Sequence, residues 1–171
     1  FWANFWNLPE HKRIVVKCNQ LGQPIGKEGG LLGQFLGTIA RNGGYCPVDV
    51  NDWRKVKKDS AETILQCIQT KFLYSRSCEK WILKSIGRDW RKHKATLKKN
   101  LFNPKKKRST LYKLCPSDID EDQWKGIIRY WKSTEGKRQA DPVKRPPHRA
   151  TVYLATHRKR VNGANDPTAC S

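Results

Sequence analysis

With 171 residues, the chain has room for one domain of ordinary size and a tail, because compact domains cluster around ~100–150 residues. It carries 35 lysines and arginines against 15 aspartates and glutamates, a formal net charge of +20, so a polyanion is its natural partner. Seven tryptophans among its aromatic residues indicate a real core and exclude full disorder. No stretch approaches the ~20 apolar residues that cross a bilayer and no signal peptide opens the chain, so we expect a soluble, intracellular protein with no membrane partner. Because it begins at Phe1 and contains no methionine, we take it for part of a longer protein.

A short strand and a first helix are predicted near the N-terminus. Residues 1–12 contain a repeated aromatic pair and form an extension to which we assign no role. Residues 13–18 have the β-branched content of a short strand, and a turn follows them. Apolar residues at helical spacing from Leu31 to Ile39 predict the first helix, and residues 42–44 predict its left-handed stop.

The middle of the chain predicts two more helices. Asp59 and Glu62 form a capping-box signature in front of an apolar stripe, which indicates that the second helix begins there. A separate helical turn is expected over residues 52–56. Ser77 is the expected cap of a third helix that runs to about Leu101.

A fourth helix and a tail complete the predicted fold. A capping box with Gln123 begins this helix, its apolar side contains two tryptophans, and Gly136 ends it. We therefore predict a mainly α fold, a compact bundle of about four helices with a small N-terminal β element, over residues 13–136. Residues 137–171 form a basic, proline-containing tail, in which residues 150–155 are a candidate strand that could pair with the first one.

The third helix is predicted to have one basic side. Residues 75–114 hold 14 basic and 2 acidic residues, a net charge of +12. At about 100° per residue, one arc of the helix is apolar and the opposite arc carries Lys84, Arg88, Arg91, Lys92, Lys98 and Lys99. A merely solvated side would mix signs, because like charges at i, i+4 destabilise a helix. We therefore predict that these six residues bind phosphates, and that Arg88 and Arg91 can also reach guanine edges.

Basic residues beyond this helix favour two compatible roles. The run Lys105, Lys106, Lys107 and Arg108 follows a proline and is typical of segments that nuclear import receptors recognise. The same side chains are also suited to contact with a nucleic-acid backbone. We expect a nuclear protein, with an import receptor as a second partner.

The tryptophans are expected to serve mainly in the core. Trp90, Trp124 and Trp131 lie on apolar stripes and Trp53 opens a helical turn, so packing explains them better than base stacking. Trp81 differs because it projects toward the basic side of the third helix. We predict that Trp81 touches the ligand.

No catalytic or metal site is predicted. The six cysteines contain no Cys-x-x-Cys pair, so buried reduced thiols are expected, and a zinc site from Cys67, Cys78, His93 and Cys115 is a minor alternative. Asp118, Asp120 and Asp122 lack the glycine and the glutamate of a calcium loop. No phosphate-loop, nucleophile-elbow or zinc-protease motif occurs. We predict a protein that is not an enzyme and uses no cofactor.

The chain resembles the plant transposase family of the Ptta/En/Spm type over about residues 13–137. Four motifs carry the resemblance: Gly22-Gln23-Pro24-Ile25-Gly26; Phe35-Leu36-Gly37-Thr38-Ile39-Ala40-Arg41 with Asp52-Trp53-Arg54-Lys55-Val56; Ile82-Leu83-Lys84-Ser85-Ile86-Gly87-Arg88-Asp89-Trp90-Arg91 with Lys94 and Leu97; and Asp120-Glu121-Asp122-Gln123-Trp124 with Tyr130-Trp131. The resemblance implies a transposon-derived, sequence-specific DNA-binding module that acts on transposon ends or host promoters without strand-transfer chemistry.

Together these observations predict a non-catalytic module that binds double-stranded DNA through the third helix (about residues 78–101), the basic run at residues 105–108 and the basic tail. One alternative is a binder of RNA or single-stranded nucleic acid that uses Trp81 and the tail. A second is an interaction module for an acidic protein partner.

Overall fold

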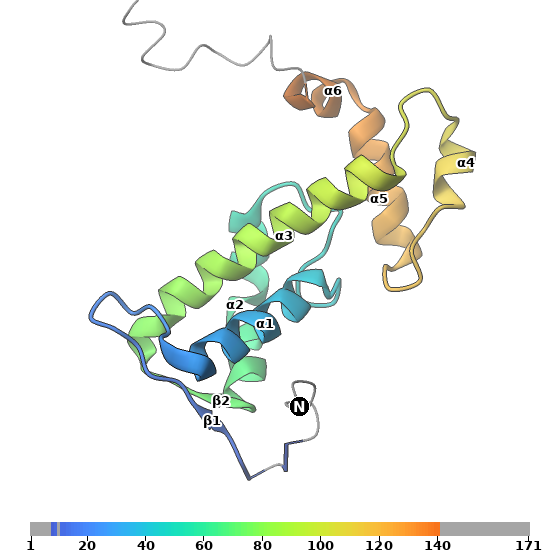
Figure 1. Ribbon diagram of the computed structural model, residues 1–171. Coiled ribbons are helices and arrows are strands. Elements are labelled where there is room, and N and C mark those ends of the chain that lie inside the picture. Colours follow the sequence, from blue (N-terminus) through green and yellow to red (C-terminus); the bar gives the residue numbers. More distant parts are fainter. Residues whose placement is uncertain (1–7, 10, 141–171) are drawn as a thin grey trace, which may run out of the picture. The chain divides into compact units, whose positions relative to one another are not determined.

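The computed structural model describes residues 8, 9 and 11–140 of the chain (Figure 1). The chain divides into two compact units between Lys132 and Ser133, slightly before the predicted start of the tail. The fold is mainly α, as predicted, with a small sheet near the N-terminus. The described elements of the first unit are β1 (Ile14–Val15), α1 (Gly26–Arg41), α2 (Trp53–Gln69), β2 (Phe72–Leu73), the 3-10 turn η1 (Arg76–Cys78), α3 (Glu79–Leu101), α4 (Arg108–Tyr112) and α5 (Glu121–Lys132). The second unit contains α6 (Thr134–Ala140).

The sheet pairs the predicted first strand with a segment that has no strand signal of its own. β1 and β2 run parallel, with Ile14 opposite Phe72 and Val15 opposite Leu73. The partner strand follows α2 directly, and the connection through α1 and α2 makes the crossover that a parallel pair requires. The candidate strand over residues 150–155 lies outside the described residues.

A first hydrophobic core joins α1, α2 and the N-terminal half of α3. Each helix contributes apolar residues spaced three or four apart, which places them on one side. The rings of Phe35 and Phe72 meet with their centroids 5.3 Å apart, so the sheet is anchored to the same core. Its buried residues include Leu32, Leu36, Ile39, Val56, Ile64, Ile68, Ile82, Ile86 and Trp90.

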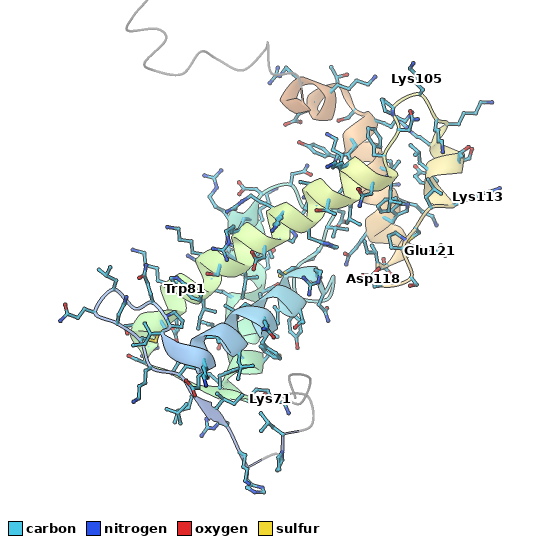
Figure 2. All side chains as sticks on the ribbon, viewed as in Figure 1. Lys71, Trp81, Lys105, Lys113, Asp118 and Glu121 are labelled. Atoms are coloured by element: carbon cyan, nitrogen blue, oxygen red, sulfur yellow. A yellow bond between two sulfur atoms is a disulfide. The ribbon has the colours of Figure 1, made fainter. Side chains whose placement is uncertain are left out.

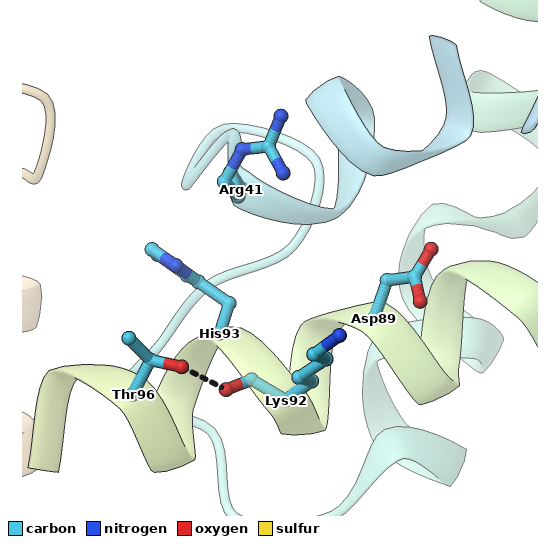
Figure 3. A pocket seen from close by; sticks show the side chains of 5 residues that line it. All are labelled: Arg41, Asp89, Lys92, His93 and Thr96. Carbon is cyan, nitrogen blue, oxygen red and sulfur yellow. Dashed lines mark hydrogen bonds between the residues drawn. The ribbon is translucent and has the colours of Figure 1, made fainter. Parts of the chain in front are cut away.

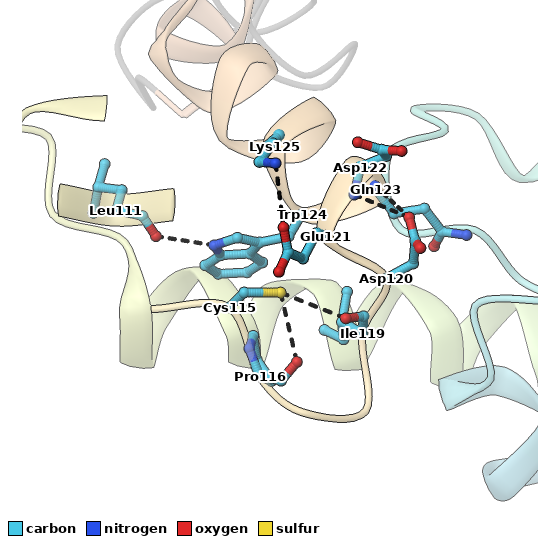
Figure 4. Close-up of polar contacts among 10 residues, drawn as sticks. All are labelled: Leu111, Cys115, Pro116, Ile119, Asp120, Glu121, Asp122, Gln123, Trp124 and Lys125. Atoms are coloured by element: carbon cyan, nitrogen blue, oxygen red, sulfur yellow. Dashed lines mark hydrogen bonds and ion pairs between the residues drawn. The ribbon is translucent and has the colours of Figure 1, made fainter. Parts of the chain in front are cut away.

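A second hydrophobic core lies around the C-terminal half of α3. Its buried residues are Val48, Leu97, Leu111, Ile119, Trp124, Ile127, Ile128 and Trp131. The indole Nε1 of Trp124 donates a hydrogen bond of 2.9 Å to the carbonyl of Leu111, so α5 is held to α4 (Figure 4). Because α3 contributes to both cores, this helix is the main support of the first unit.

The second predicted helix begins earlier than its sequence signal indicates. The carboxylate of Asp52 accepts a hydrogen bond of 2.9 Å from the backbone N–H of Arg54, and α2 starts at Trp53. The helical turn expected over residues 52–56 and the helix expected from Asp59 are therefore one helix. The signature of Asp59 and Glu62 lies inside this longer helix and does not mark its start.

Two other expected helix boundaries are also different. The stop after α1 is not left-handed, since Gly22 and Gly26 are the described residues with positive φ, and Asn42 instead donates its N–H to the carbonyl of Ile39 at 3.0 Å. Ser77 does not cap α3 directly. Ser75 accepts from the N–H of Ser77 at 3.4 Å and begins the 3-10 turn that leads into the helix.

The start of α5 combines a local cap with a long-range tie. The carboxylate of Asp120 accepts from the backbone N–H groups of Asp122 and Gln123, at 2.9 and 3.1 Å (Figure 4). The side chain of Gln123 does not close the predicted capping box. It donates to the carbonyl of Gly43 at 2.9 Å and accepts from the N–H of Val48 at 3.2 Å, which fixes the loop between α1 and α2.

The expectation of reduced thiols is wrong at two positions. Cys18 and Cys78 are joined by a disulfide that spans 60 residues and ties the segment before α1 to the start of α3. Gly22 lies in the same segment, and a side chain there would collide with the carbonyl of Ser77. The segment is therefore closely packed on the 3-10 turn. Cys46, Cys67 and Cys115 are free thiols.

Candidate nucleic-acid interface

One side of α3 presents cations to solvent. The exposed lysines and arginines are Lys80, Lys84, Arg88, Arg91, Lys92 and Lys99, and we call this set the basic side of α3. At about 100° per residue they lie within roughly 120° of arc. Five of the six were predicted from the sequence. Lys80 was missed, although it precedes Lys84 by one helical turn.

The basic side is held on a rigid support. α3 has 23 residues and is therefore about 35 Å long, at a rise of about 1.5 Å per residue. Its opposite side is buried in both hydrophobic cores, through Ile86 and Trp90 in the first and Leu97 in the second. The backbone that carries the cations is thus fixed before any ligand binds.

Few carboxylates neutralise these cations. Ion pairs in the described part of the chain join Asp52 to Arg54, Asp89 to Arg88 and Glu121 to Lys125. Only one involves the basic side of α3, where the Nε of Arg88 lies 3.2 Å from a carboxylate oxygen of Asp89. The Arg88 side chain stays 67% exposed, and this pair leaves its two Nη groups available.

Lys98 differs from its predicted position. It is half-buried, and its Nζ lies 5.9 Å from the ring centroid of Phe102 and 5.8 Å from that of Trp131. Burial lowers the pKa of Lys98. Lys98 therefore covers the second core through cation–π contacts and is not one of the exposed cations of the basic side.

Lys94 is a second lysine of α3 that faces the protein. Its Nζ donates a hydrogen bond to the carbonyl of Val50 and lies 4.2 Å from the centroid of the Trp90 ring. Burial lowers the pKa of Lys94 to about 8, and the nearby carboxylate of Asp49 opposes this shift. These contacts connect α3 to the segment that precedes α2.

The predicted basic run is an ordered turn that leads into α4. Asn103 accepts from the N–H of Lys105 through its side chain at 2.9 Å and from the N–H of Lys106 through its carbonyl at 3.2 Å. The Nζ of Lys132, at the end of α5, donates to the carbonyl of Pro104 at 2.7 Å and to that of Lys106. No sequence motif indicates this role for Lys132.

This turn and the first residue of α4 together form residues 103–108, which follow the end of α3, and we call them the basic loop. The side chains of Lys105, Lys106, Lys107 and Arg108 are all exposed, and Figure 2 shows Lys105 at its outer end. Lys132 contacts backbone carbonyls of this loop, so its contacts occupy none of the four basic side chains. These side chains stay free for a ligand. The loop therefore adds cations next to the C-terminal end of the basic side.

Trp81 lies near the basic side through its position along α3 (Figure 2). Its side chain is half-buried against the first core, and its contact with a ligand stays a prediction. The other four tryptophans among the described residues serve in packing, as expected. Trp53 and Trp90 meet at 5.7 Å between ring centroids, and Trp124 and Trp131 meet at 6.1 Å.

The structure does not assemble the zinc ligands that the sequence offered as an alternative. Among the described residues, no group of three or more histidine, cysteine, aspartate or glutamate side chains is placed to hold a metal ion. Cys78 is instead bonded to Cys18, and Cys115 donates to the carbonyl of Ile119 at 3.4 Å (Figure 4). None of the helices described has the length and apolar character needed to cross a bilayer.

Comparisons with protein-family models, with curated proteins and with solved structures found no match to this chain.

Proposed function

We propose that this chain binds double-stranded DNA, without catalysing a reaction, through the basic side of α3 and the adjoining basic loop. The observation that supports this most strongly is the row of exposed cations on α3 of which only Arg88 has a carboxylate partner among the described residues. Like charges at i, i+4 destabilise a helix, so such a row is unfavourable in the free protein. Phosphates on a duplex would offset that repulsion and release counterions.

The aromatic residues favour a duplex over an unpaired strand. Proteins that bind single strands stack bases on accessible aromatic side chains. Every described phenylalanine, tyrosine and tryptophan is buried or half-buried. The bases of a duplex are already stacked, so a duplex needs no such platform.

Base contacts would come from two arginines of the basic side. The pair with Asp89 fixes the direction of the Arg88 guanidinium and leaves two Nη groups for a guanine edge. Arg91 is exposed and, within the described residues, has no acidic partner. We propose that these two residues supply sequence preference while the lysines supply backbone affinity.

The resemblance to plant transposases of the Ptta/En/Spm type is part of this proposal, because that family consists of DNA-binding modules. A nuclear location is proposed with it. Import receptors would find the four exposed cations of the basic loop accessible, although three of them lie in an ordered turn.

A salt titration with matched variants tests the proposal. If the four lysines of the basic side each contact a phosphate, they contribute about −3.6 to the slope of log affinity against log salt. That contribution alone would lower the affinity for a duplex about 150-fold between about 50 and 200 mM salt. Replacing Lys84 and Lys99 by glutamine should reduce the slope by about two, whereas the control pair Lys57→Gln and Lys58→Gln on α2 should change it little.

Other results would contradict the proposal. Equal losses in both double variants would mean that affinity follows net charge alone. Tighter binding of a single-stranded oligonucleotide than of its duplex would favour the RNA or single-strand alternative. Selection from random duplexes, repeated with Arg88→Ala and Arg91→Ala, tests base contact, since only the unmodified chain should enrich a motif.

A further inference from the structure

A surface pocket lies where the end of α1 meets the middle of α3 (Figure 3). Its volume is about 370 Å³, and it is lined by Arg41 from α1 and by Asp89, Lys92, His93 and Thr96 from α3. α1 packs along α3, which brings the last residue of α1 over this stretch of the longer helix. The pocket borders the basic side of α3 because Lys92 belongs to both.

The charges around the pocket are mainly positive. Asp89 is paired with Arg88, which offsets its negative charge. Neither Arg41 nor Lys92 has an ion-pair partner in the described part of the chain. Two cations from different helices therefore face a space whose lining carboxylate, that of Asp89, is paired with Arg88.

The lining of the pocket defines the chemical class of its ligand. All five lining side chains carry a charged or polar group, so the pocket suits a ligand with polar groups. The hydroxyl of Thr96 already donates to the carbonyl of Lys92 at 3.0 Å. The cationic donors are therefore Arg41, Lys92 and, when protonated, His93, and such a set suits a phosphate group.

We propose that this pocket binds one phosphate group through Arg41 and Lys92, with His93 beside it. This inference rests on the proposed DNA function for its natural source, a phosphodiester of a duplex lying on the basic side of α3. The same chemistry would accept inorganic phosphate or a nucleotide phosphate, and the test below separates these sources.

His93 makes the pocket sensitive to pH. Its Nε2 is buried and has no hydrogen-bond partner, so no contact at this atom stabilises the charged ring. The charged groups that face it are Arg41 from α1, Asp118 from the segment before α5, and Asp89 and Lys92 on its own helix. Burial, followed by the charge of Arg41, lowers the pKa of His93, and Asp118 opposes this. A bound phosphate would raise this pKa, so binding and protonation should strengthen each other.

Three variants test the pocket. Arg41→Gln removes one cation from it, Lys27→Gln removes one exposed cation from the opposite end of the same helix, and His93→Gln removes the titrating ring. The first readout is the salt dependence of duplex binding. The second is the pKa of the His93 ring, followed by NMR with and without inorganic phosphate. Circular dichroism checks that each variant folds.

The expected results differ between the variants. Arg41→Gln should reduce the salt slope of duplex binding by about 0.9, and Lys27→Gln should not. Lowering the pH from about 7 to about 5.5 should tighten duplex binding more for the unmodified chain than for His93→Gln. Inorganic phosphate should raise the His93 pKa in the unmodified chain and leave it unchanged in Arg41→Gln.

The outcomes separate this inference from the proposed function. If the duplex binds but Arg41→Gln and Lys27→Gln have the same slope, and phosphate leaves the His93 pKa unchanged, the pocket is not a phosphate site and the DNA proposal stands. If the duplex does not bind while phosphate still raises the His93 pKa, the DNA proposal fails and the source is a free phosphate or a nucleotide. If neither binds, both are wrong.

Discussion

Some lysines of α3 present their ammonium groups to solvent, and others use them to pack against the protein. Lys84 and Lys99 are exposed, whereas Lys94 places its ammonium over an indole ring and against a backbone carbonyl. The sequence cannot separate these cases, because each lysine lies within a few positions of an apolar residue. A long aliphatic stem allows a lysine to cover the core or to leave it, and the neighbouring segments decide which.

The buried lysine predicts a specific pH dependence of stability. The folded-state pKa of Lys94 is about 8, below its ordinary value of 10.5, so between these two values the unfolded chain binds more protons than the folded chain. The free energy of unfolding should therefore rise with pH across this window, and the unfavourable charge is fully present below it. Lys94→Met removes this titration.

The measurement compares the unmodified chain with Lys94→Met in urea unfolding across the same pH range. The difference between the two unfolding free energies should shift in favour of the unmodified chain as the pH rises. Parallel curves would show that the ammonium of Lys94 is not desolvated in the folded state. Tyrosines and cysteines that titrate in this range are common to both proteins, so their effects cancel.

One glycine of α3 is required by the approach of α2. A Cβ at Gly87 would lie 2.5 Å from the Nε1 and 2.6 Å from the Cε2 of the Trp53 ring, closer than packed atoms approach. Gly87→Ala should therefore destabilise the fold by about 1–3 kcal/mol in urea unfolding. Gly33→Ala on α1 is the matched control, because a Cβ there meets nothing within 4 Å. It should stabilise the fold by about 0.5–1 kcal/mol, and the same sign for both variants would contradict this packing.

At the scale of elements, the helices were predictable and their connections were not. Apolar residues three and four apart in residues 31–39 and 82–101 indicate helices because one side of each must be buried. β2 has only two residues and no period that a sequence could show. α4 was missed because it has five residues and follows a run of cations, where only the burial of Leu111 favours a helix.

The basic loop is held in place by Lys132, a residue more distant in the sequence, so a change at Lys132 should loosen the loop. Lys132→Met removes the two hydrogen bonds to the carbonyls of Pro104 and Lys106. Amide exchange over residues 103–107 should become faster, and duplex affinity should fall about three- to tenfold, because the loop must then be ordered on binding. Lys125→Met removes an equal charge from the same helix and breaks only a surface ion pair with Glu121. Equal effects of both variants would mean that charge alone matters.

For the molecule as a whole, the sequence predicted where the charge gathers but not how it is used. Helical spacing alone shows that most cations of α3 share one side of the helix. Which of them remain free depends on contacts between segments distant in the sequence, such as Lys98 with Trp131. Arg41 shows the same limit, because only the packing of α1 along α3 places it beside Lys92.

The net charge of +20 predicts opposite effects of salt on the free and the bound protein. The free chain repels itself, so raising salt from about 10 mM to about 0.1 M, which shortens the screening length from about 30 to about 10 Å, should raise its Tm. A duplex at about 100 times its Kd should add about 2.7 kcal/mol at low salt, and this gain should vanish as salt weakens binding. Calorimetry with and without duplex measures both trends. A Tm of the free protein that falls with salt would mean that attraction between surface charges exceeds repulsion, and the row of unpaired cations on α3 would then need no phosphate to explain it.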